Sequence, residues 1–301
     1  MPPTCPPSGV FAPVATIFDG DGLIDTPRFG ENLEFYAGSE LDGVVLLGSN
    51  GEFATLEHAE RMRVVEIGTE TIAGRKTVMA GTSAESTRAT IETTRAAASL
   101  GIDYALVITP HYYKTRYDKR AYLNHFLKVA EASPVPILIY VMAAYTGVDL
   151  APSIVCELAG HPNIVGVKDS GGNAGKVAQI IAGAGEQFAV LAGSANFLYP
   201  ALCLGATGGI LALGNIAPRQ CAELYRLWAA GDHESARQLQ LRMIAPNAAV
   251  TSGFGIAGLK AALEMVGLHG GIPREPLLPL TEAERGELAD VLKAAGIDRV
   301  G

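Results

Sequence analysis

Short runs of apolar residues recur along most of the chain, and a longer segment of mixed apolar and polar residues follows each of them. The runs are continuously apolar, as expected of parallel strands that are buried on both faces. Their centres lie about 20–35 residues apart, which is the spacing of strand–helix units. The predicted strands span residues 10–18, 43–47, 76–80, 104–108, 136–141, 164–168, 188–192 and 209–213.

Helices are predicted between these strands, and beyond residue 217 the pattern is helical only. Thr26 followed by Pro27 is typical of a helix start, with a capping residue before a proline. Thr55 is expected to cap the second helix, although His58 stands where a complete capping box has an acid or amide. The predicted helices span 26–38, 55–72, 85–99, 118–132, 152–159, 173–182, a short apolar segment before residue 209, and 217–230, 232–248, 254–267 and 282–295.

Eight strands that alternate with helices favour an α/β fold, a closed (β/α)8 or TIM barrel. A doubly wound open sheet is the alternative. That fold usually has a glycine-rich turn after its first strand, whereas Asp19 to Gly22 is Asp-Gly-Asp-Gly here. We expect residues 1–230 to form the barrel and residues 231–301 to form an appended C-terminal helical segment packed on it.

In a parallel barrel, the side chains that carry chemistry lie at the C-terminal ends of the strands. Lys168 ends the sixth predicted strand, and alternation would place it on the same face as Ile164 and Gly166. Burial disfavours the charged form of a lysine and lowers its pKa, and a neutral amine is a nucleophile. The alternative is a structural lysine that extends to solvent or pairs with Asp169.

Polar residues follow several other strands. The set combines one amine nucleophile, phenols that can transfer a proton, and small groups that can hold an anion. A tyrosine at the end of an apolar strand is often a core residue, but alternation can place Tyr140 beside Lys168. The candidates at the strand ends are Ser49, Asn50, Thr109, Tyr112, Tyr113, Tyr140, Ser170, Gly193, Ser194 and Ile210.

Composition and charge narrow the classes of partner. The 301 residues are 49% hydrophobic and 18% charged, which is typical of a folded globular chain. A net charge of -8 without any basic run argues against nucleic acid as a partner. Residues 1–8 lack the features of a secretory signal, and no apolar run is long enough to span a bilayer. We therefore expect no membrane partner.

The spacings of the cysteines and histidines argue against a C-x-x-C motif and against a metal site. The four cysteines, Cys5, Cys156, Cys203 and Cys221, never form a C-x-x-C pair, so we expect reduced thiols and a cytoplasmic protein. The six histidines never fall at a metal-binding spacing, so no metal is predicted. The segment 253–258 fits G-x-G-x-x-G but follows a helical segment, so close helix packing or a tight entry to the last helices is expected there instead of a dinucleotide. No cofactor is predicted.

Taken together, these motifs resemble the dihydrodipicolinate synthase and N-acetylneuraminate lyase family of Schiff-base aldolases, over nearly the whole chain. The resemblance lies in the G-x-x-G-E turn at 48–52, Thr109-Pro110 before the tyrosines, Tyr140, and Gly-Val-Lys-Asp at 166–169. Further stretches at 161–172, 191–195 and 246–251 are similar to the subgroup of 4-hydroxy-2-oxoglutarate aldolases.

This resemblance implies a role for each candidate. Lys168 would form an imine with a small 2-oxo acid, and Tyr140 would move protons. Tyr112, or its neighbour Tyr113, would reach the site of an adjacent subunit in a homo-oligomer, a dimer or a tetramer. The substrate carboxylate would be held by Ser49 and Asn50, and the pocket would be lined by Ser170, Gly193 and Ile210.

The resemblance also implies a departure from the synthases. Those enzymes have an arginine in the loop after the catalytic tyrosine, where this chain has Tyr145, which puts condensation with aspartate semialdehyde in doubt. The expected activity is cleavage of a 4-hydroxy-2-oxo acid to pyruvate, with glyoxylate as the second product from 4-hydroxy-2-oxoglutarate. The alternatives are an aldolase or dehydratase of 2-keto-3-deoxy sugar acids, a dihydrodipicolinate synthase, and a non-catalytic barrel that binds an oxo acid.

Overall fold

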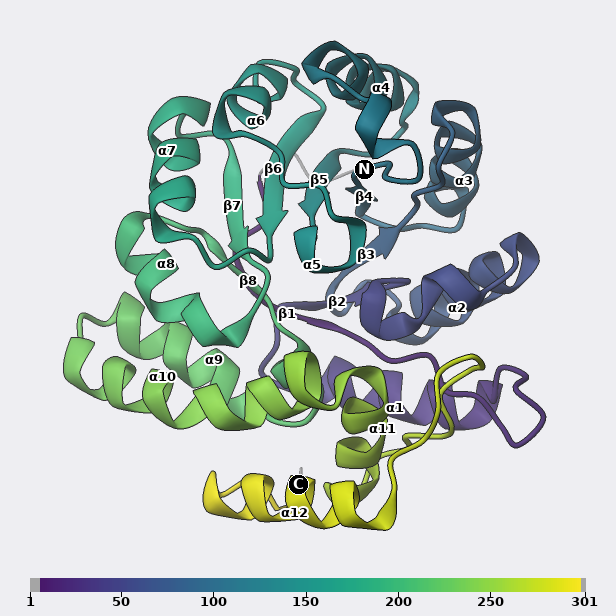
Figure 1. Ribbon diagram of the computed structural model, residues 1–301, viewed down its shortest axis with the longest axis vertical. Coiled ribbons are helices and arrows are strands. Elements are labelled where there is room, and N and C mark those ends of the chain that lie inside the picture. The colour runs from purple at the N-terminus through teal and green to yellow at the C-terminus, as the bar shows by residue number, and fades with distance from the viewer. Residues whose placement is uncertain (1–5, 299–301) are drawn as a thin grey trace.

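A computed structural model describes residues 6–298 and shows a closed barrel of eight parallel strands surrounded by helices (Figure 1). The strands follow one another around the ring in sequence order, and the last strand pairs with the first. The predicted (β/α)8 barrel is therefore confirmed, and the open-sheet alternative is wrong. The strands are β1 (Gly9–Pro13), β2 (Gly43–Leu46), β3 (Thr77–Gly81), β4 (Tyr104–Ile108), β5 (Ile137–Val141), β6 (Ile164–Asp169), β7 (Ala189–Ala192) and β8 (Gly208–Ile210).

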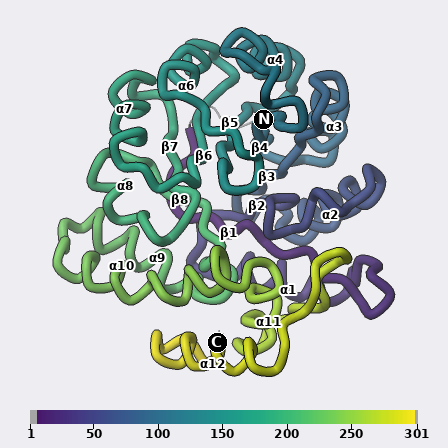
Figure 2. Tube along the Cα trace, viewed as in Figure 1, coloured from purple at the N-terminus to yellow at the C-terminus, as the bar shows by residue number. Residues whose placement is uncertain are grey.

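One principal helix follows each strand, and three further helices follow the barrel. The barrel helices are α1 (Thr26–Gly38), α2 (His58–Ile72), α3 (Thr87–Ser99), α4 (Lys119–Ala132), α6 (Pro152–Leu158), α7 (Ala174–Ala184), α8 (Leu198–Leu204) and α9 (Pro218–Ala229), with the short α5 (Ala143–Thr146) directly after β5. The appended helices are α10 (His233–Ala248), α11 (Gly255–Met265) and α12 (Glu282–Ala294). These three gather with α9 and α1 on one side of the barrel (Figure 2).

Two strands end several residues earlier than predicted. The first ends at Pro13 instead of residue 18, and Phe18 instead forms an antiparallel bridge with Ile24. The intervening residues remain buried because they run beneath the C-terminal segment, where the Ile272 amide donates to the Phe18 carbonyl at 3.4 Å. The last strand ends at Ile210, after which the chain turns into a short 3-10 helix. Burial outside the sheet thus produced the same apolar pattern as a strand.

The start of α2 also differs from the prediction. The Thr55 hydroxyl donates to the Glu52 carbonyl at 2.9 Å, so it belongs to the preceding turn. The capping residue is Glu57, and its amide donates to the Glu60 side chain at 2.9 Å. An acid three residues after Glu57 therefore completes a capping box that begins two residues later than predicted.

The alternation predicted for β6 is wrong at its first residues. The pairing with β5 shifts by one residue, so that Ile164 faces Ile137 while Gly166 faces Leu138. Ile164 consequently packs in the core between strands and helices, and Val165 contacts the core inside the barrel. Beyond this irregularity Lys168 keeps its predicted inward direction, because Tyr140 and Leu191 on either side of it belong to the inner core.

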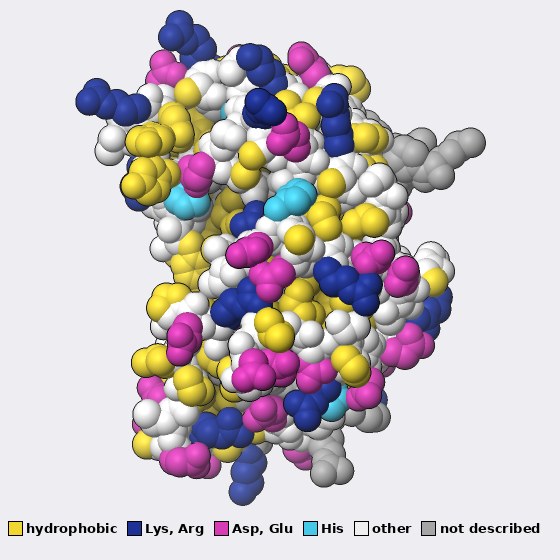
Figure 3. Space-filling view, turned by 90° about the vertical axis from the view of Figure 1, so that its right-hand side faces the viewer, with side chains coloured by type: hydrophobic (Ala, Val, Ile, Leu, Met, Phe, Trp, Pro, Cys, Tyr) yellow, Lys and Arg dark blue, Asp and Glu magenta, His cyan; other side chains and the backbone are white. Residues whose placement is uncertain are grey.

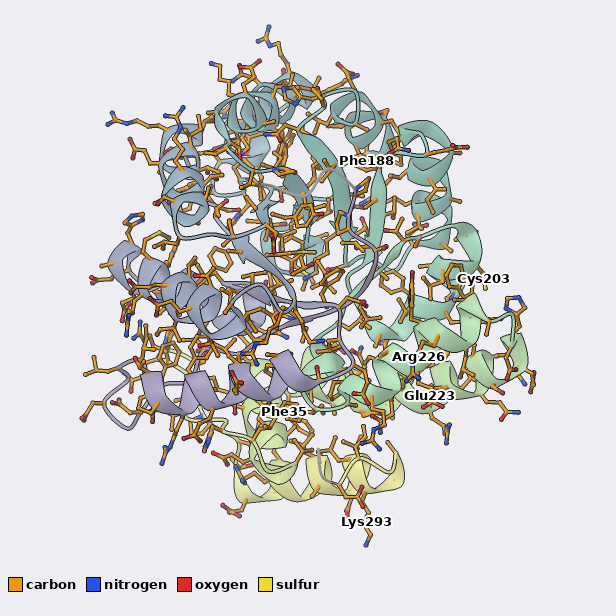
Figure 4. The ribbon with its side chains drawn as sticks, turned by 180° about the vertical axis from the view of Figure 1, so that it is seen from behind. Phe35, Phe188, Cys203, Glu223, Arg226 and Lys293 are labelled. Atoms are coloured by element: carbon orange, nitrogen blue, oxygen red, sulfur yellow. The ribbon has the colours of Figure 1, made fainter. Side chains whose placement is uncertain are left out.

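The surface face that carries α2 and α3 has no basic patch, because acidic and basic side chains are interspersed over it (Figure 3). Within residues 6–298, no helix combines the length and the apolar character needed to cross a bilayer. Cys156, Cys203 and Cys221 are free thiols, and Cys203 lies on the outer side of α8 (Figure 4). Cys5 lies outside the described residues.

Candidate active site

A cavity of about 460 Å³ lies at the C-terminal ends of the strands. Side chains from the ends of β2, β5, β6 and β7 line it, together with the turn that joins α10 to α11. Seven of the candidates chosen from the sequence meet there: Ser49, Asn50, Tyr140, Lys168, Ser170, Gly193 and Ser194. No group of three or more metal-ligating side chains is found in the described part of the chain.

Lys168 lies at the base of this cavity and is only 3% exposed. It is paired across the sheet with Tyr140 on β5 and Leu191 on β7, and its Nζ lies 4.2 Å from the centre of the Tyr140 ring. Burial lowers the pKa of Lys168 from its ordinary value to about 7. At neutral pH a large fraction of this amine is therefore uncharged and can act as a nucleophile.

Asp169 does not pair with Lys168, so that alternative is wrong. The Asp169 carboxylate is on the other side of the strand, 2.6 Å from the Nζ of Lys176, which also pairs with Asp149. Its second oxygen accepts the Gly171 amide at 2.9 Å, which fixes the turn that carries Ser170. Among residues 6–298, Lys168 has no carboxylate partner that would hold it in its charged form.

Tyr140 connects Lys168 to the turn after β2. Its hydroxyl lies 3.3 Å from the Oγ of Ser49, within reach of a hydrogen bond. Burial raises the pKa of the Tyr140 phenol, and the hydroxyls of Ser49 and Ser170 partly offset this rise. The phenol is therefore protonated at neutral pH and can both donate and accept a hydrogen bond.

Two polar atoms around this pair are poorly hydrogen-bonded within residues 6–298. The Asn50 Nδ2 and the Ser170 Oγ are buried and make no hydrogen bond of good geometry among the described residues, although the Ser170 hydroxyl is near enough to Tyr140 to affect its pKa. Buried polar atoms are nearly always paired, so such groups on a cavity wall are suited to a bound ligand. Ser49 and Asn50 lie in one turn of 3-10 helix, Ser49–Gly51, whose donors can hold a carboxylate.

Because Gly193 has no side chain, the Ser170 hydroxyl can occupy the space beside it. A Cβ atom at this position would lie 2.0 Å from the Ser170 Oγ and 2.8 Å from the Asp169 carbonyl oxygen. The Gly193 amide also donates to that carbonyl at 2.7 Å. Ile210, in contrast, is fully buried in the inner core with Tyr140 and Leu191 and is not part of the cavity wall.

Tyr112 and Tyr113 lie away from the cavity of their own chain. Their side chains are 75% and 62% exposed, and the two rings pack edge to face with centres 4.9 Å apart. The Glu85 carboxylate accepts the amides of His111 and Tyr112 at 3.1 and 2.9 Å, which anchors the segment. Tyr145 lies closer, because α5 places it on the cavity wall while its side chain remains half exposed. A role of Tyr112 in a neighbouring subunit stays a prediction.

One wall of the cavity was not predicted from the sequence. A π-helical turn, Ala249–Gly253, joins α10 to α11 and contributes Val250, Thr251 and Ser252 to the lining, with Gly255 and Ile256 from the start of α11. In the G-x-G-x-x-G segment at 253–258, a Cβ at Gly258 would lie 2.5 Å from the Phe254 Cβ, so this glycine allows a tight entry into α11. A π-turn is frequently found at functional sites, and the proline at 246 within a helical pattern was the available signal.

A buried ion pair joins the turn after β2 to the appended helices. The Glu52 carboxylate lies 2.7 Å from the Nζ of Lys260 on α11, and both side chains are at most 1% exposed. The same carboxylate accepts the Arg274 amide at 2.8 Å, and Lys260 also donates to the Ile272 carbonyl at 2.7 Å. The C-terminal segment therefore supports the turn that carries Ser49.

Comparison of the sequence with known proteins finds one matching family and relatives that are similar over nearly their whole length. The model of the Dihydrodipicolinate synthetase family matches residues 6–295. The 4-hydroxy-tetrahydrodipicolinate synthase of Methanothrix thermoacetophila is 38% identical over 285 residues, which cover 94% of this chain and 95% of that protein. A probable mitochondrial 4-hydroxy-2-oxoglutarate aldolase of Emericella nidulans is 35% identical over 287 residues, which cover 94% of this chain and 93% of that protein.

Solved structures agree with this grouping. A dihydrodipicolinate synthase of Bacillus anthracis superposes with a TM-score of 0.92 at 28% identity, covering 97% of this chain and 99% of that one. The dihydrodipicolinate synthase of Acinetobacter baumannii, solved as a complex with pyruvate, superposes with a TM-score of 0.91 at 32% identity, covering 96% and 99%.

Proposed function

This chain belongs to the dihydrodipicolinate synthetase family, and we propose that it is a lysine-dependent aldolase that cleaves a 4-hydroxy-2-oxo acid and releases pyruvate. Membership makes it an enzyme of the lyase and aldolase type. The proposal adds Lys168 as the imine-forming group and a 4-hydroxy-2-oxo acid as the substrate. It is carried by the buried Lys168 amine beside the Tyr140 phenol, with no carboxylate partner among residues 6–298.

The reaction begins on the neutral amine. Lys168 attacks C2 of the oxo acid, and loss of water leaves a protonated imine. Deprotonation of the C4 hydroxyl then drives cleavage of the C3–C4 bond, whose electron pair moves into the imine to form an enamine. The aldehyde leaves, C3 of the enamine takes up a proton, and water hydrolyses the resulting imine to pyruvate and free lysine. The proton lost from the hydroxyl is balanced by the one gained at C3.

In this proposal Tyr140 moves that proton. Because its pKa is raised by burial, the phenol is a relay and not a standing base. It accepts the hydrogen from the C4 hydroxyl as its own hydrogen passes to the Ser49 Oγ, 3.3 Å away, and Ser49 in turn passes its hydrogen to the C1 carboxylate that it holds. Ser49 and Asn50 hold the C1 carboxylate, and the Ser170 hydroxyl faces the same space.

Within the class of 4-hydroxy-2-oxo acids, we propose 4-hydroxy-2-oxoglutarate as the substrate. Its cleavage would give glyoxylate as the second product. This assignment is supported by the relative from Emericella nidulans, named as a probable aldolase of that compound. The synthases are the second candidate, because the 38% identical relative from Methanothrix thermoacetophila carries that name. Tyr145 on the cavity wall favours the aldolase, since a phenol cannot replace an arginine as a charged partner for the carboxylate of a second substrate.

We also propose a homo-oligomer, a dimer or a tetramer, in the cytoplasm. The exposed aromatic pair Tyr112 and Tyr113 supports a contact with a second copy, through which Tyr112 would extend the relay of the neighbouring site. Relatives differ in this respect, since one similar structure is described as a monomeric dihydrodipicolinate synthase variant. Sedimentation of the wild type and of Tyr112→Ala would test the contact.

The test of the proposed function traps the imine. Borohydride added with pyruvate should leave a reduced adduct on Lys168, located by mass spectrometry of the digested protein. Lys168→Ala should lose both the adduct and pyruvate release from 4-hydroxy-2-oxo acids. Lys293→Ala, on the distant α12 (Figure 4), is the matched control and should retain both. An unmodified Lys168, or full cleavage by Lys168→Ala, would overturn the proposal.

A further inference from the structure

Two buried amides of α10 hold the turn that follows β7. Gln240 and Asn247 lie seven residues apart, on one face of the helix, and are 5% and 0% exposed. The Gln240 side chain donates to the Ala195 carbonyl at 2.6 Å and accepts the Tyr199 amide at 2.9 Å. Gln240 therefore holds the backbone of this turn, whereas Asn247 contacts only its side chains.

Asn247 determines which atoms of the turn remain available to a ligand. Its Nδ2 donates to the Ser194 Oγ and to the Asn196 Oδ1, each at 2.9 Å. The Ser194 Oγ also accepts the backbone amide of Asn196 at 3.3 Å. Because both acceptor positions of this hydroxyl are occupied, its hydrogen is left to donate elsewhere. The Asn196 oxygen is likewise engaged, which leaves its own side-chain N–H groups to donate.

These donors face the cavity of the proposed active site. Ser194 and Asn196 both line it, whereas Asn247 stands behind them. Lys168 is the sole lysine or arginine on the cavity wall among the described residues. Any second anionic group of a substrate is therefore held there by neutral donors, which bind carboxylate oxygens well when they are aligned in advance.

We infer that Ser194 and Asn196, aligned by Asn247, form a subsite for the carboxylate at the far end of a dicarboxylic 4-hydroxy-2-oxo acid. The inference rests on the proposed aldol cleavage and names the substrate class. Ser49 and Asn50 take the carboxylate next to the reacting ketone, and the β7 turn takes the other one. Asn247 touches no substrate and acts as a positioning residue, through Ser194 and Asn196.

The test compares two substrates that differ only at the far end. 4-Hydroxy-2-oxoglutarate carries a carboxylate there, and 4-hydroxy-2-oxopentanoate carries a methyl group. Asn247→Asp keeps the shape but turns a donor into an acceptor, so the Ser194 hydroxyl would donate to residue 247 and not to the ligand. The ratio of kcat/KM for the dicarboxylate to that for the monocarboxylate should fall roughly 10- to 100-fold, as expected for lost hydrogen bonds to a charged group.

Two further variants separate this role from general loosening of the turn. Ser194→Ala removes one donor directly and should lower the same ratio about tenfold. Gln240→Leu disturbs only the backbone of the turn and should affect both substrates alike. Gln238→Leu, which changes an exposed glutamine of the same helix, is the matched control and should leave the ratio at its wild-type value.

Each variant is also tested by borohydride trapping with pyruvate. Pyruvate lacks the second carboxylate, so trapping measures imine formation independently of the proposed subsite. Absence of an adduct in the wild type would overturn the aldolase and this subsite together. If the wild type is trapped but the ratio is unchanged in Asn247→Asp and Ser194→Ala, the subsite is overturned and the aldolase stands. Should Asn247→Asp fail to fold, the ratio measured with Ser194→Ala decides.

Discussion

Removing Lys260 should destabilise the protein strongly, because it leaves the Glu52 carboxylate buried without its cation. The pair is separated by 2.7 Å, and both side chains are at most 1% exposed. Burial lowers the pKa of Lys260, and Glu52 opposes that shift, so the two charges depend on each other. Breaking a buried pair by removing one partner costs about 3–5 kcal/mol.

We expect Lys260→Met to fall near the lower end of that range, about 3 kcal/mol, since Glu52 keeps one further partner. The Arg274 amide still donates to Glu52 at 2.8 Å. In the double variant Glu52→Gln/Lys260→Met no buried charge is left without a partner, so the free energy of unfolding should fall by only about 1–2 kcal/mol. The double variant should therefore be more stable than Lys260→Met alone.

Unfolding in urea, followed by fluorescence and by circular dichroism, measures the three free energies of unfolding. Coincidence of the two signals establishes that each comparison uses a two-state transition. Lys293→Met, at an exposed position of α12, is the matched control for loss of a lysine and should change stability by less than about 0.5 kcal/mol. A double variant no more stable than Lys260→Met, or a loss below about 1 kcal/mol in Lys260→Met, would refute the reasoning.

Four other predictions concern the site. The rate of pyruvate trapping should rise with pH through about 7, because the folded chain depresses the pKa of Lys168 and the amine reacts when neutral; a rate that is constant from about pH 5 to about pH 9 contradicts this. Between about 7 and the ordinary value of 10.5 the unfolded chain binds more protons at Lys168, so this group makes stability rise with pH in that window. Tyr140→Phe should lower turnover by about 10²–10⁴ yet still form a trapped imine, and full turnover would remove Tyr140 from the mechanism. Gly193→Ala should displace the Ser170 hydroxyl and lower kcat/KM at least about tenfold, with a cost of about 1–3 kcal/mol in stability from overpacking; unchanged kinetics would show that the hydroxyl is not needed.

Much of the fold could be predicted because each barrel strand is buried on both faces. Continuous apolar runs such as 104–108 and 137–141 are typical of buried parallel strands, and their regular spacing with helices between them excludes most folds. The same reasoning led to Lys168 and Tyr140, since both end such a run, and neighbouring strands place them side by side. The predicted end of the first strand was wrong, because burial of residues 14–18 beneath the C-terminal segment produced an apolar pattern like that of a strand.

The sequence alone thus determined the barrel, the inward-facing lysine and the phenol beside it, because these depend on local periodicity and on neighbouring strands. Only the tertiary structure decided which groups support them. Asp169 pairs with Lys176, Glu52 pairs with Lys260, and Asn247 holds Ser194 from 53 residues away. No periodicity in the chain encodes such contacts, since they arise when helices pack against the finished barrel. The reactivity of Lys168 has the same origin, because its pKa is lowered by burial, which the packed barrel around the amine supplies.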